Sequence, residues 1–303
     1  MTKKLHILFL CSWFPSKELP TNGDFILRHA KAISLKHRVS VLHIVSSKKI
    51  NKTRIDTSEE NNLTTYIGYV KHTKNSFLKA VRFYKTYLQI LKLIGTYDLI
   101  HLNTLYSFGL FALQQKIFKR KPFIISEHWT GYLNSRKKNI SSAQLILSKL
   151  IVKNAAFVCP VSVELKNGMQ NLGLKGNYVP IGNVIDTKVF FPTDKKKNTF
   201  NMEHVSGLND AQKNITGMLK VEKLLENSIS NFTWKFIGGS SKKYEKFISQ
   251  LQIKTDKIEF HNHLTHKELN NQLQKTNNCL SFRTFTTSVY LMHKNSATGA
   301  FGI

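Results

Sequence analysis

The sequence has 303 residues, of which 41% are hydrophobic, and 45 Lys and Arg against 18 Asp and Glu give a formal net charge of +27. This composition is typical of a globular protein with room for two domains, and it excludes a disordered chain. The 15 Gly, 6 Pro and 3 Cys exclude collagen-like and disulfide-stapled proteins.

In the first half of the chain, short apolar runs alternate with stretches of helical periodicity. The expected strands are Leu5–Cys11, Val39–Val45, Asp98–Asn103, Phe123–Ser126 and Ala155–Pro160, and the expected helices are Asp24–Lys36, Phe77–Ile94, Ser107–Phe118 and Ser162–Asn171. The polar segment Ile50–Asn62 is predicted to be a surface excursion. Fully apolar strands between helices predict a parallel sheet that is covered on both faces.

The alternation lapses between residues 181 and 200, where Gly182, Pro192 and three consecutive lysines indicate a linker. It then resumes with the strands Met202–Val205, Phe232–Ile237, Ile258–His261 and Cys279–Phe282 and the helices Ile215–Leu225, Ser241–Gln252 and Lys267–Gln274. We therefore expect an α/β protein with two parallel-sheet domains, residues 1–180 and 201–303. Such domains bind ligands at the carboxyl ends of their strands, and the two can face each other across a cleft.

No apolar run approaches the length of a membrane-spanning helix. Lys3 and Lys4 before the run Leu5–Cys11 imitate a secretory signal, but Trp13-Phe14-Pro15 replaces the small residues of a cleavage site. The three cysteines are far apart in apolar segments, which favours reduced intracellular thiols: Cys11, Cys159 and Cys279. We therefore expect a cytoplasmic protein.

The positive charge attracts nucleic acid, anionic lipid or phosphorylated substrates alike. Its lysines are scattered and outnumber the arginines, so we expect no nucleic-acid partner. Two basic stretches, Phe77–Ile94 and Leu133–Asn154, leave two interpretations open: a helix resting on an anionic membrane, or a surface helix that packs on the core. In the first stretch the apolar residues that recur at helical spacing are Phe77, Val81, Tyr84, Leu88 and Leu91.

Residues that could bind an anion or a sugar follow two strands of the first domain. Gly23 and Asp24 open a helix after the first strand, where free N–H groups can approach an anion or a sugar hydroxyl; a plain capped turn is the alternative. Glu127 and His128 follow the strand Phe123–Ser126, with two aromatic residues behind them that offer a platform for a sugar ring. A hydrogen-bonded structural histidine is the alternative there.

The second domain has two corresponding loops. Lys213 lies at a predicted helix N-terminus, where its ammonium group and the free N–H groups can meet a diphosphate. Gly238 and Gly239 end the next strand and offer a second backbone cradle. Neither loop has the Gly-Lys-Ser/Thr of a P-loop or the Gly-x-Gly-x-x-Gly of a dinucleotide-binding fold.

The order of these motifs resembles the retaining glycosyltransferases of the group 1 type, glycosyltransferase family 4. The similarity runs from Leu5 to about Phe282 and rests also on Ser12-Trp13-Phe14-Pro15, on Val161-Ser162 with Met169 and Gly173, and on Val179–Phe190. The last segment is similar to the hinge signature of the family, in which an Asn-x-x-Asp unit ends the first domain. The resemblance implies a GT-B architecture, with two Rossmann-like domains that face each other and a second domain that is incomplete.

The resemblance implies transfer of a sugar from a nucleotide-diphosphate sugar to a glycan or lipid-linked acceptor, with retention, in cell-surface polysaccharide synthesis. It implies no cofactor beyond the donor co-substrate and no metal. Peripheral contact with the inner face of an anionic membrane is an expectation that rests on the two basic stretches and not on this resemblance. His128 would contact the transferring sugar, Lys213 would hold the diphosphate, and Gly238 and Gly239 would let the backbone approach it. The residues that would lie near the acceptor and the phosphates are Gly23, Asp24 and Glu127.

The sequence departs from the family at two places. Gly207 stands where the family commonly has an arginine, and no acidic residue follows Arg283, although the family has two glutamates in this region; their positions would fall near Phe285 and near His293 or Lys294. We therefore expect a chain that is truncated within its second domain. A non-catalytic remnant that binds acceptor or membrane is the first alternative, and a basic nucleic-acid-binding protein is the second.

Overall fold

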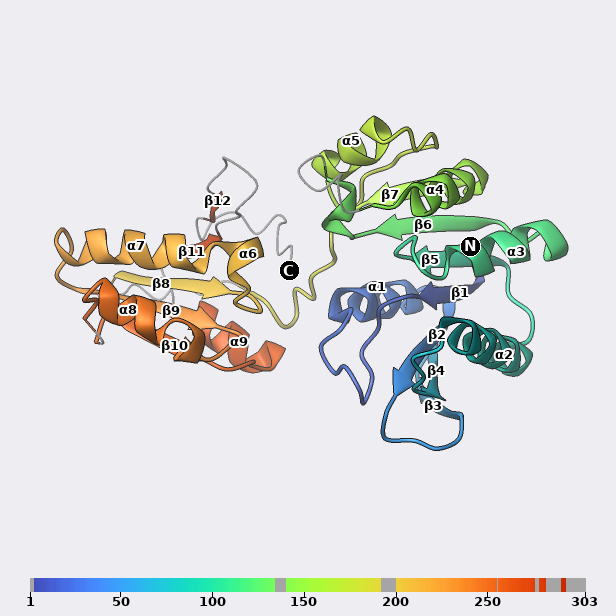
Figure 1. Ribbon diagram of the computed structural model, residues 1–303, viewed down its shortest axis with the longest axis horizontal. Helices are drawn as coiled ribbons and strands as arrows, with labels where there is room; N and C mark the ends of the chain where they lie inside the picture. The colour runs from blue at the N-terminus through green and yellow to red at the C-terminus, as the bar shows by residue number, and fades with distance from the viewer. Residues whose placement is uncertain are drawn as a thin grey trace. The chain divides into compact units, whose positions relative to one another are not determined.

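The structure, a computed structural model, describes residues 3–133, 140–191, 200–254, 256–275, 278–281 and 290–292. The chain forms two compact units that divide between Val184 and Ile185, a point within the predicted linker 181–200. Figure 1 shows that each unit is a sheet with helices packed against it. The expected fold class, an α/β protein with two Rossmann-like units, is confirmed. That the two units face each other across a cleft stays a prediction.

The first unit contains a seven-stranded sheet with the order β3-β4-β2-β1-β5-β6-β7. The parallel strands are β1 (His6–Cys11), β2 (Arg38–Ser47), β4 (Leu63–Lys71), β5 (Leu99–Asn103), β6 (Phe123–Glu127) and β7 (Phe157–Pro160). The order reverses between β1 and β5, as in dinucleotide-binding folds.

Helices cover both faces of this sheet: α1 (Asp24–Ser34), α2 (Ser76–Ile94), α3 (Gly109–Lys119), α4 (Ser142–Asn154), α5 (Val163–Asn171) and the short 3₁₀ turn η1 (Thr130–Tyr132). Alternate residues of β1 point to opposite faces. Phe9 packs in one core with α1, whereas Leu8 and Leu10 pack in the other core with α2, α3 and α4. Figure 1 shows α1 and α2 on opposite sides of β1 and β2.

The edge of the sheet differs from the prediction. Part of the expected surface excursion Ile50–Asn62 is a strand, β3 (Arg54–Glu60), which runs antiparallel to the unpredicted strand β4. The side chains of β3 are mostly exposed, so its sequence lacks the apolar run that marked the central strands. An antiparallel edge strand can pair through its backbone while its side chains stay in water, so the polar sequence of β3 gave no apolar pattern from which to predict a strand.

Helix α2 differs from the prediction in which of its apolar residues are buried. Its buried side chains are Thr86, Tyr87, Ile90 and Ile94, and the predicted apolar row is a different one. Of that row, Phe77, Tyr84 and Leu88 are exposed. The helix therefore carries a second apolar row, and the one found in the sequence is exposed at Phe77, Tyr84 and Leu88 and reaches the core at Leu91.

The second unit contains a five-stranded sheet with the order β10-β9-β8-β11-β12, and β12 is antiparallel to β11. Its strands are β8 (Phe200–Val205), β9 (Phe232–Ile237), β10 (Ile258–His261), β11 (Asn278–Ser281) and β12 (Tyr290–Met292). Its helices are α6 (Asp210–Lys213), α7 (Ile215–Glu226), α8 (Glu245–Gln250) and α9 (His266–Leu273), with a 3₁₀ turn η3 (Ser241–Lys243). The predicted helix Ser241–Gln252 is thus split before α8. Trp234 and Phe236 of β9 lie in its core beside Met218 and Leu219 of α7.

The predicted places of the two family glutamates lie outside the described residues: Phe285, His293 and Lys294. Cys11 and Cys159 are buried and unpaired, and burial raises the pKa of both thiols. In the described part of the chain, every helix is too short or too polar to cross a bilayer.

Candidate active site

The carboxyl ends of β1 and β5 meet where the strand order of the first unit reverses, which is the place where open α/β sheets bind ligands. Ser12, directly after β1, connects the two ends. Its hydroxyl oxygen accepts hydrogen bonds from the backbone N–H groups of Ser107 and Phe108, at 3.0 and 3.3 Å, in the loop before α3. The loops that border the predicted site are therefore held together.

Gly23 brings the loop after β1 against the start of α1. Its φ is +70°, and a Cβ atom here would lie 2.7 Å from the carbonyl carbon of Trp13. Only glycine allows both this angle and this approach. Asp24, the next residue, pairs with Arg28 at 3.4 Å one turn later in the helix. The structure thus places both predicted residues at the helix start, and their contact with acceptor or phosphates stays a prediction.

Glu127 ends β6, and its side chain is completely buried. Its Oε1 accepts hydrogen bonds from the N–H groups of His128 and Trp129 at 2.9 and 2.8 Å, and its Oε2 accepts one from Leu105 at 2.8 Å. Burial raises the pKa of the carboxyl group to about 7, although these three donors favour the charged form. Because backbone groups occupy both oxygens, Glu127 positions two neighbouring loops.

His128 lies in the loop after β6. Its ring centroid is 4.4 Å from that of Phe25 and 5.8 Å from that of His29, both on α1. Both ring nitrogens are buried and have no hydrogen-bond partner among the described residues. Burial, with smaller contributions from His29 and His101, lowers the pKa of His128 to about 3. At neutral pH the ring is therefore an uncharged imidazole with unused hydrogen-bonding capacity.

Two further histidines near His128 were not predicted from the sequence. His29 is buried, and its Nε2 lies 3.4 Å from Oδ1 of Asn183. His101 of β5 is buried, and its Nε2 lies 2.7 Å from the Ser126 hydroxyl. Burial lowers the pKa of both, that of His101 to about 3. The spacing of four residues between Phe25 and His29 is the signal that places them on one face of α1.

In the second unit, Gly238 and Gly239 bring the turn after β9 against the loop after β8. Gly238 has a φ of +115°, and a Cβ atom there would collide with the carbonyl oxygen of Ser206. The N–H groups of both glycines donate to the carbonyl oxygen of His261, at 2.9 and 3.1 Å. The close backbone packing requires Gly238, and its N–H is already used within the unit. Contact of either glycine with a diphosphate stays a prediction.

The structure corrects the surroundings of Lys213. This residue ends the short helix α6, and the longer helix α7 begins two residues later. At the start of α7, Asp210 accepts a hydrogen bond from the N–H of Thr216 at 2.7 Å, and Asn214 accepts one from Gly217 at 3.1 Å. The expected free N–H groups are therefore partly occupied, because Asp and Asn are good helix caps.

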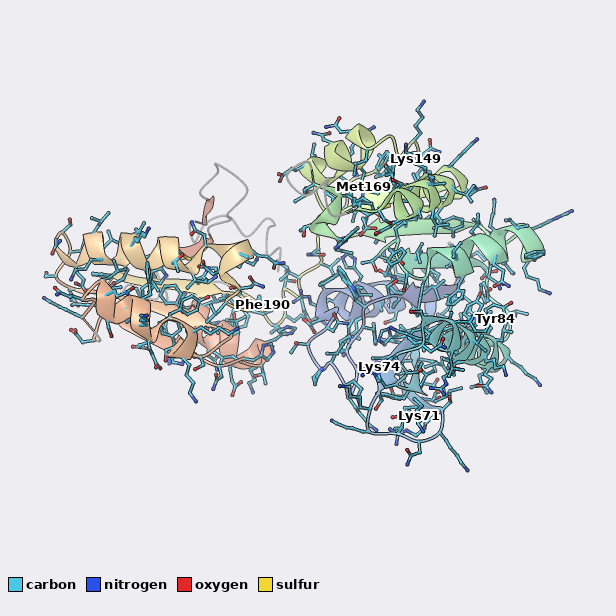
Figure 2. The ribbon with its side chains drawn as sticks, viewed as in Figure 1. Lys71, Lys74, Tyr84, Lys149, Met169 and Phe190 are labelled. Atoms are coloured by element: carbon cyan, nitrogen blue, oxygen red, sulfur yellow. The ribbon has the colours of Figure 1, made fainter. Side chains whose placement is uncertain are left out.

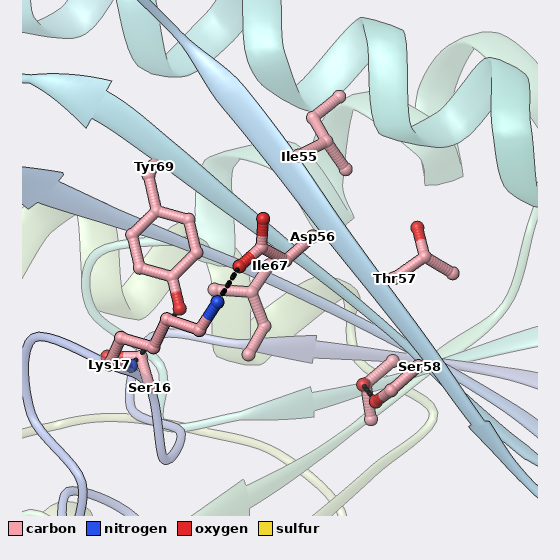
Figure 3. A pocket seen from close by; sticks show the side chains of 9 residues that line it. Ser16, Lys17, Ile55, Asp56, Thr57, Ser58, Ile67 and Tyr69 are labelled. Carbon is pink, nitrogen blue, oxygen red and sulfur yellow. Dashed lines mark hydrogen bonds and ion pairs between the residues drawn. The ribbon is translucent and has the colours of Figure 1, made fainter. Parts of the chain in front are cut away.

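A separate groove of about 500 Å³ lies on the β3–β4 hairpin beside the loop after β1. Figure 3 shows Lys17 reaching across it to Asp56, at 2.9 Å, with the Tyr69 hydroxyl nearby. The Lys17 ammonium, together with Arg54, lowers the pKa of Asp56. The remaining lining residues are Ser16, Ile55, Thr57, Ser58, Thr65 and Ile67. Hydroxyl groups and one ion pair suit a polar ligand, and His128 is not part of this lining.

The predicted residues thus form two groups. In the first unit, Glu127 and His128 lie at the end of β6, and Gly23 and Asp24 lie at the start of α1. In the second unit, Gly238 and Gly239 follow β9, and Lys213 ends α6. A shared site of the two groups stays a prediction. Within the described ranges, no His, Cys, Asp or Glu side chains gather in threes in a way that could hold a metal ion.

Comparison with known proteins agrees with this class of fold. Residues 22–189 match the model of Glycosyltransferase Family 4, and this match covers more than half of the chain. The chain belongs to this family. No curated protein sequence matches it significantly.

Several solved structures share the fold. A UDP-forming α,α-trehalose-phosphate synthase from Burkholderia vietnamiensis is 10% identical, with a TM-score of 0.61 over 91% of this chain and 75% of that one. The catalytic domain of starch synthase IV from Arabidopsis thaliana, bound to ADP and acarbose, is 11% identical, with a TM-score of 0.58 over 91% and 77%. A putative UDP-N-acetylglucosamine 2-epimerase from Listeria monocytogenes is 9% identical, with a TM-score of 0.54 over 92% and 74%. At these identities the likeness concerns the fold alone.

Proposed function

We propose that the protein transfers a sugar from a nucleotide-diphosphate sugar to a hydroxyl group of a glycan or lipid-linked acceptor, with retention, in cell-surface polysaccharide synthesis. The observation that carries this proposal is the family match over residues 22–189, which include Gly23, Asp24, Glu127 and His128. Two of the solved structures with this fold are described as UDP-forming or ADP-bound, which supports a nucleotide-diphosphate donor.

On the donor side, Lys213 would neutralise charge that develops on the leaving nucleoside diphosphate. Two features make Lys213 more important for binding the diphosphate. Gly207 supplies no second cation, and the carboxylate of Asp210 occupies the start of α7. A diphosphate near the start of α7 would be repelled by Asp210, so the ammonium group of Lys213 must offset that repulsion. We propose that binding proceeds without a metal ion or a cofactor.

On the sugar side, His128 would bind a hydroxyl of the transferring sugar through its uncharged ring. Its two unpartnered nitrogens can serve as one donor and one acceptor. The Phe25 ring lies against it, so the sugar must share or replace this contact. Glu127 would act as a positioning residue, because it holds the N–H of His128 itself.

The acceptor would lie in the first unit. The loop after β1 leads from Trp13, packed against Gly23, to Ser16 and Lys17 in the polar groove. This loop therefore connects the start of α1 with a lining of hydroxyl groups that suits a glycan. Replacing Lys17 by Ala would raise the KM for the acceptor and leave donor affinity unchanged.

The test measures donor binding by calorimetry with UDP, GDP and ADP sugars, and transfer in the presence and absence of EDTA. We expect Lys213→Ala to weaken binding of the donor about tenfold, with the exposed Lys220→Ala as control. We expect His128→Ala to abolish transfer and to weaken binding of the nucleotide sugar, while affinity for the free nucleoside diphosphate stays within about twofold, with the exposed His72→Ala as control.

Three other results would favour a different function for this chain. Saturable binding of no nucleotide sugar would refute the transfer proposal for this chain. Acceptor or vesicle binding without donor binding would identify the non-catalytic remnant. A steep salt dependence of DNA or RNA affinity would favour the nucleic-acid alternative.

A further inference from the structure

We propose that the outer surface of α2, α3 and α4 docks on an anionic lipid bilayer. These helices are neighbours on one face of the first sheet, and we call their solvent-facing side the α2–α4 surface. Figure 2 draws its side chains, with Tyr84 of α2 and Lys149 of α4 labelled. The proposal does not depend on sugar transfer.

The first observation is the second apolar row of α2. The core takes Thr86, Tyr87, Ile90 and Ile94, so burial in the protein does not account for Phe77 and Leu88 on another side of the helix. Their side chains are 79% and 44% exposed. A row of exposed large side chains at helical spacing indicates a surface that is covered by something else.

The neighbouring helices continue this surface. Tyr84 joins α2 to α3, because its ring lies 6.2 Å from Phe111 and its hydroxyl accepts a hydrogen bond from Gln114 at 2.7 Å. On α3, Ile117 and Phe118 are 61% and 75% exposed. On α4, which packs on α3, the exposed apolar residues are Ile146 and Leu150. Large apolar side chains thus reach solvent on all three helices.

The second observation is charge. The three helices carry eight basic residues and no Asp or Glu: Lys79, Arg82, Lys85, Lys92, Lys116, Lys119, Lys149 and Lys153. Lys85 and Lys92 are exposed on α2 beside Leu88. Apolar groups that enter the acyl boundary, flanked by lysines at the level of anionic headgroups, are the chemistry of an interfacial helix.

This pairing distinguishes a bilayer from other occupants. A second copy of the chain would bring the same basic helices opposite these and would leave their charges unpaired. A nucleic acid would use the lysines but would leave Phe77, Phe118 and Ile146 without an apolar partner. A lipid surface satisfies both kinds of side chain.

The test is co-sedimentation of the full chain with vesicles of phosphatidylglycerol and phosphatidylcholine, compared with phosphatidylcholine alone. The apolar variant combines Phe77→Ser, Leu88→Ser and Ile117→Ser, all at exposed positions. The charge variant combines Lys85→Glu and Lys92→Glu. Its matched control combines Lys48→Glu and Lys49→Glu, which changes the net charge equally at exposed positions after β2.

We expect the protein to bind the anionic vesicles, and both surface variants to lower the partition coefficient about tenfold or more. The matched control should stay within about twofold of the unmodified protein. A second control, Leu35→Ser, removes an 82% exposed side chain that follows α1 on the opposite face, and should have no effect. The phosphatidylcholine vesicles should bind weakly.

Three results would overturn the proposal. The anionic vesicles do not bind; the charge variant and its matched control lose binding equally, which would assign it to net charge alone; or the apolar variant binds as well as the unmodified protein. Sedimentation velocity completes the test. A dimer that the apolar variant dissociates, with vesicle binding unchanged, would make this surface an interface between copies.

Discussion

Glu222 of α7 provides a quantitative test of the packing in the second unit. Its side chain is completely buried, and neither carboxyl oxygen has a hydrogen-bond partner among the described residues. Burial, with the nearby charge of Glu226, raises its pKa from 4.5 to about 7. The folded state therefore holds this proton more tightly than the unfolded chain, so stability is full at low pH and falls as the pH rises between these two values.

Replacing Glu222 by Gln removes the titration and keeps the shape of the side chain. The pKa difference predicts that the variant gains about 2 kcal/mol in free energy of unfolding near pH 6 and about 3 kcal/mol near pH 8. The ammonium groups of Lys223 and Lys257 favour the charged form and keep this pKa from rising further. Scanning calorimetry of the full chain measures the effect as a rise of several degrees in the melting temperature of the second unit near pH 8, and the smallest rise near pH 5.

Glu226 supplies the matched control on the same helix. Its carboxylate pairs with Lys223 at 2.9 Å and accepts a hydrogen bond from the N–H of Lys254 at 2.5 Å. Glu226→Gln should therefore lower the melting temperature near pH 8, opposite in sign to Glu222→Gln. A Glu222→Gln variant that is no more stable than the unmodified protein near pH 8 would refute this role of Glu222.

Three further predictions concern the strand ends. Gly238→Ala should lower the free energy of unfolding by about 2 kcal/mol or more, because of its positive φ and its contact with a carbonyl oxygen, whereas Gly207→Ala, whose Cβ would meet open space, should stay within about 1 kcal/mol in urea titrations. Glu127→Gln should cost about 2 to 4 kcal/mol near neutral pH, since an amide group cannot accept all three N–H donors; a neutral result in the same titrations would contradict this role. Phe25→Ala should raise the pKa of His128 from about 3 toward its ordinary value, and a proton NMR titration of the ring that shows no change would count against shielding by Phe25.

The central strands were predictable because their burial on both faces leaves a continuous apolar run. An example is β1, for which the predicted strand Leu5–Cys11 is one residue longer than the observed His6–Cys11. In the second unit, Phe232–Ile237 and the partly buried edge strand Ile258–His261 were predicted with the bounds that the structure has. The hairpin of β3 and β4 was not, because Arg54–Glu60 pairs through its backbone and leaves its polar side chains in water. On α2 the periodicity was correct, but two apolar rows were present and the sequence did not say which one is buried.

The placement of Glu127, His128 and Gly238 after strands of the two sheets was predictable, since the apolar runs before them marked those strands. That these loops carry a site stays a prediction. How the side chains are used was not predictable. The carboxyl group of Glu127 serves three backbone N–H groups, and those of Gly238 and Gly239 already bond to His261. Asp210 caps α7 where free N–H groups were expected. These bonds join residues far apart in the sequence or depend on loop geometry that periodicity does not describe.

The three hydrogen bonds of Glu127 have a consequence for local motion. The N–H groups of Leu105, His128 and Trp129 belong to two loops but share one buried acceptor. Exchange of any one of them with solvent deuterium requires this carboxylate to release it, so the three amides should lose protection together. We therefore expect local opening to involve both loops at once, as one cooperative unit of hydrogen exchange.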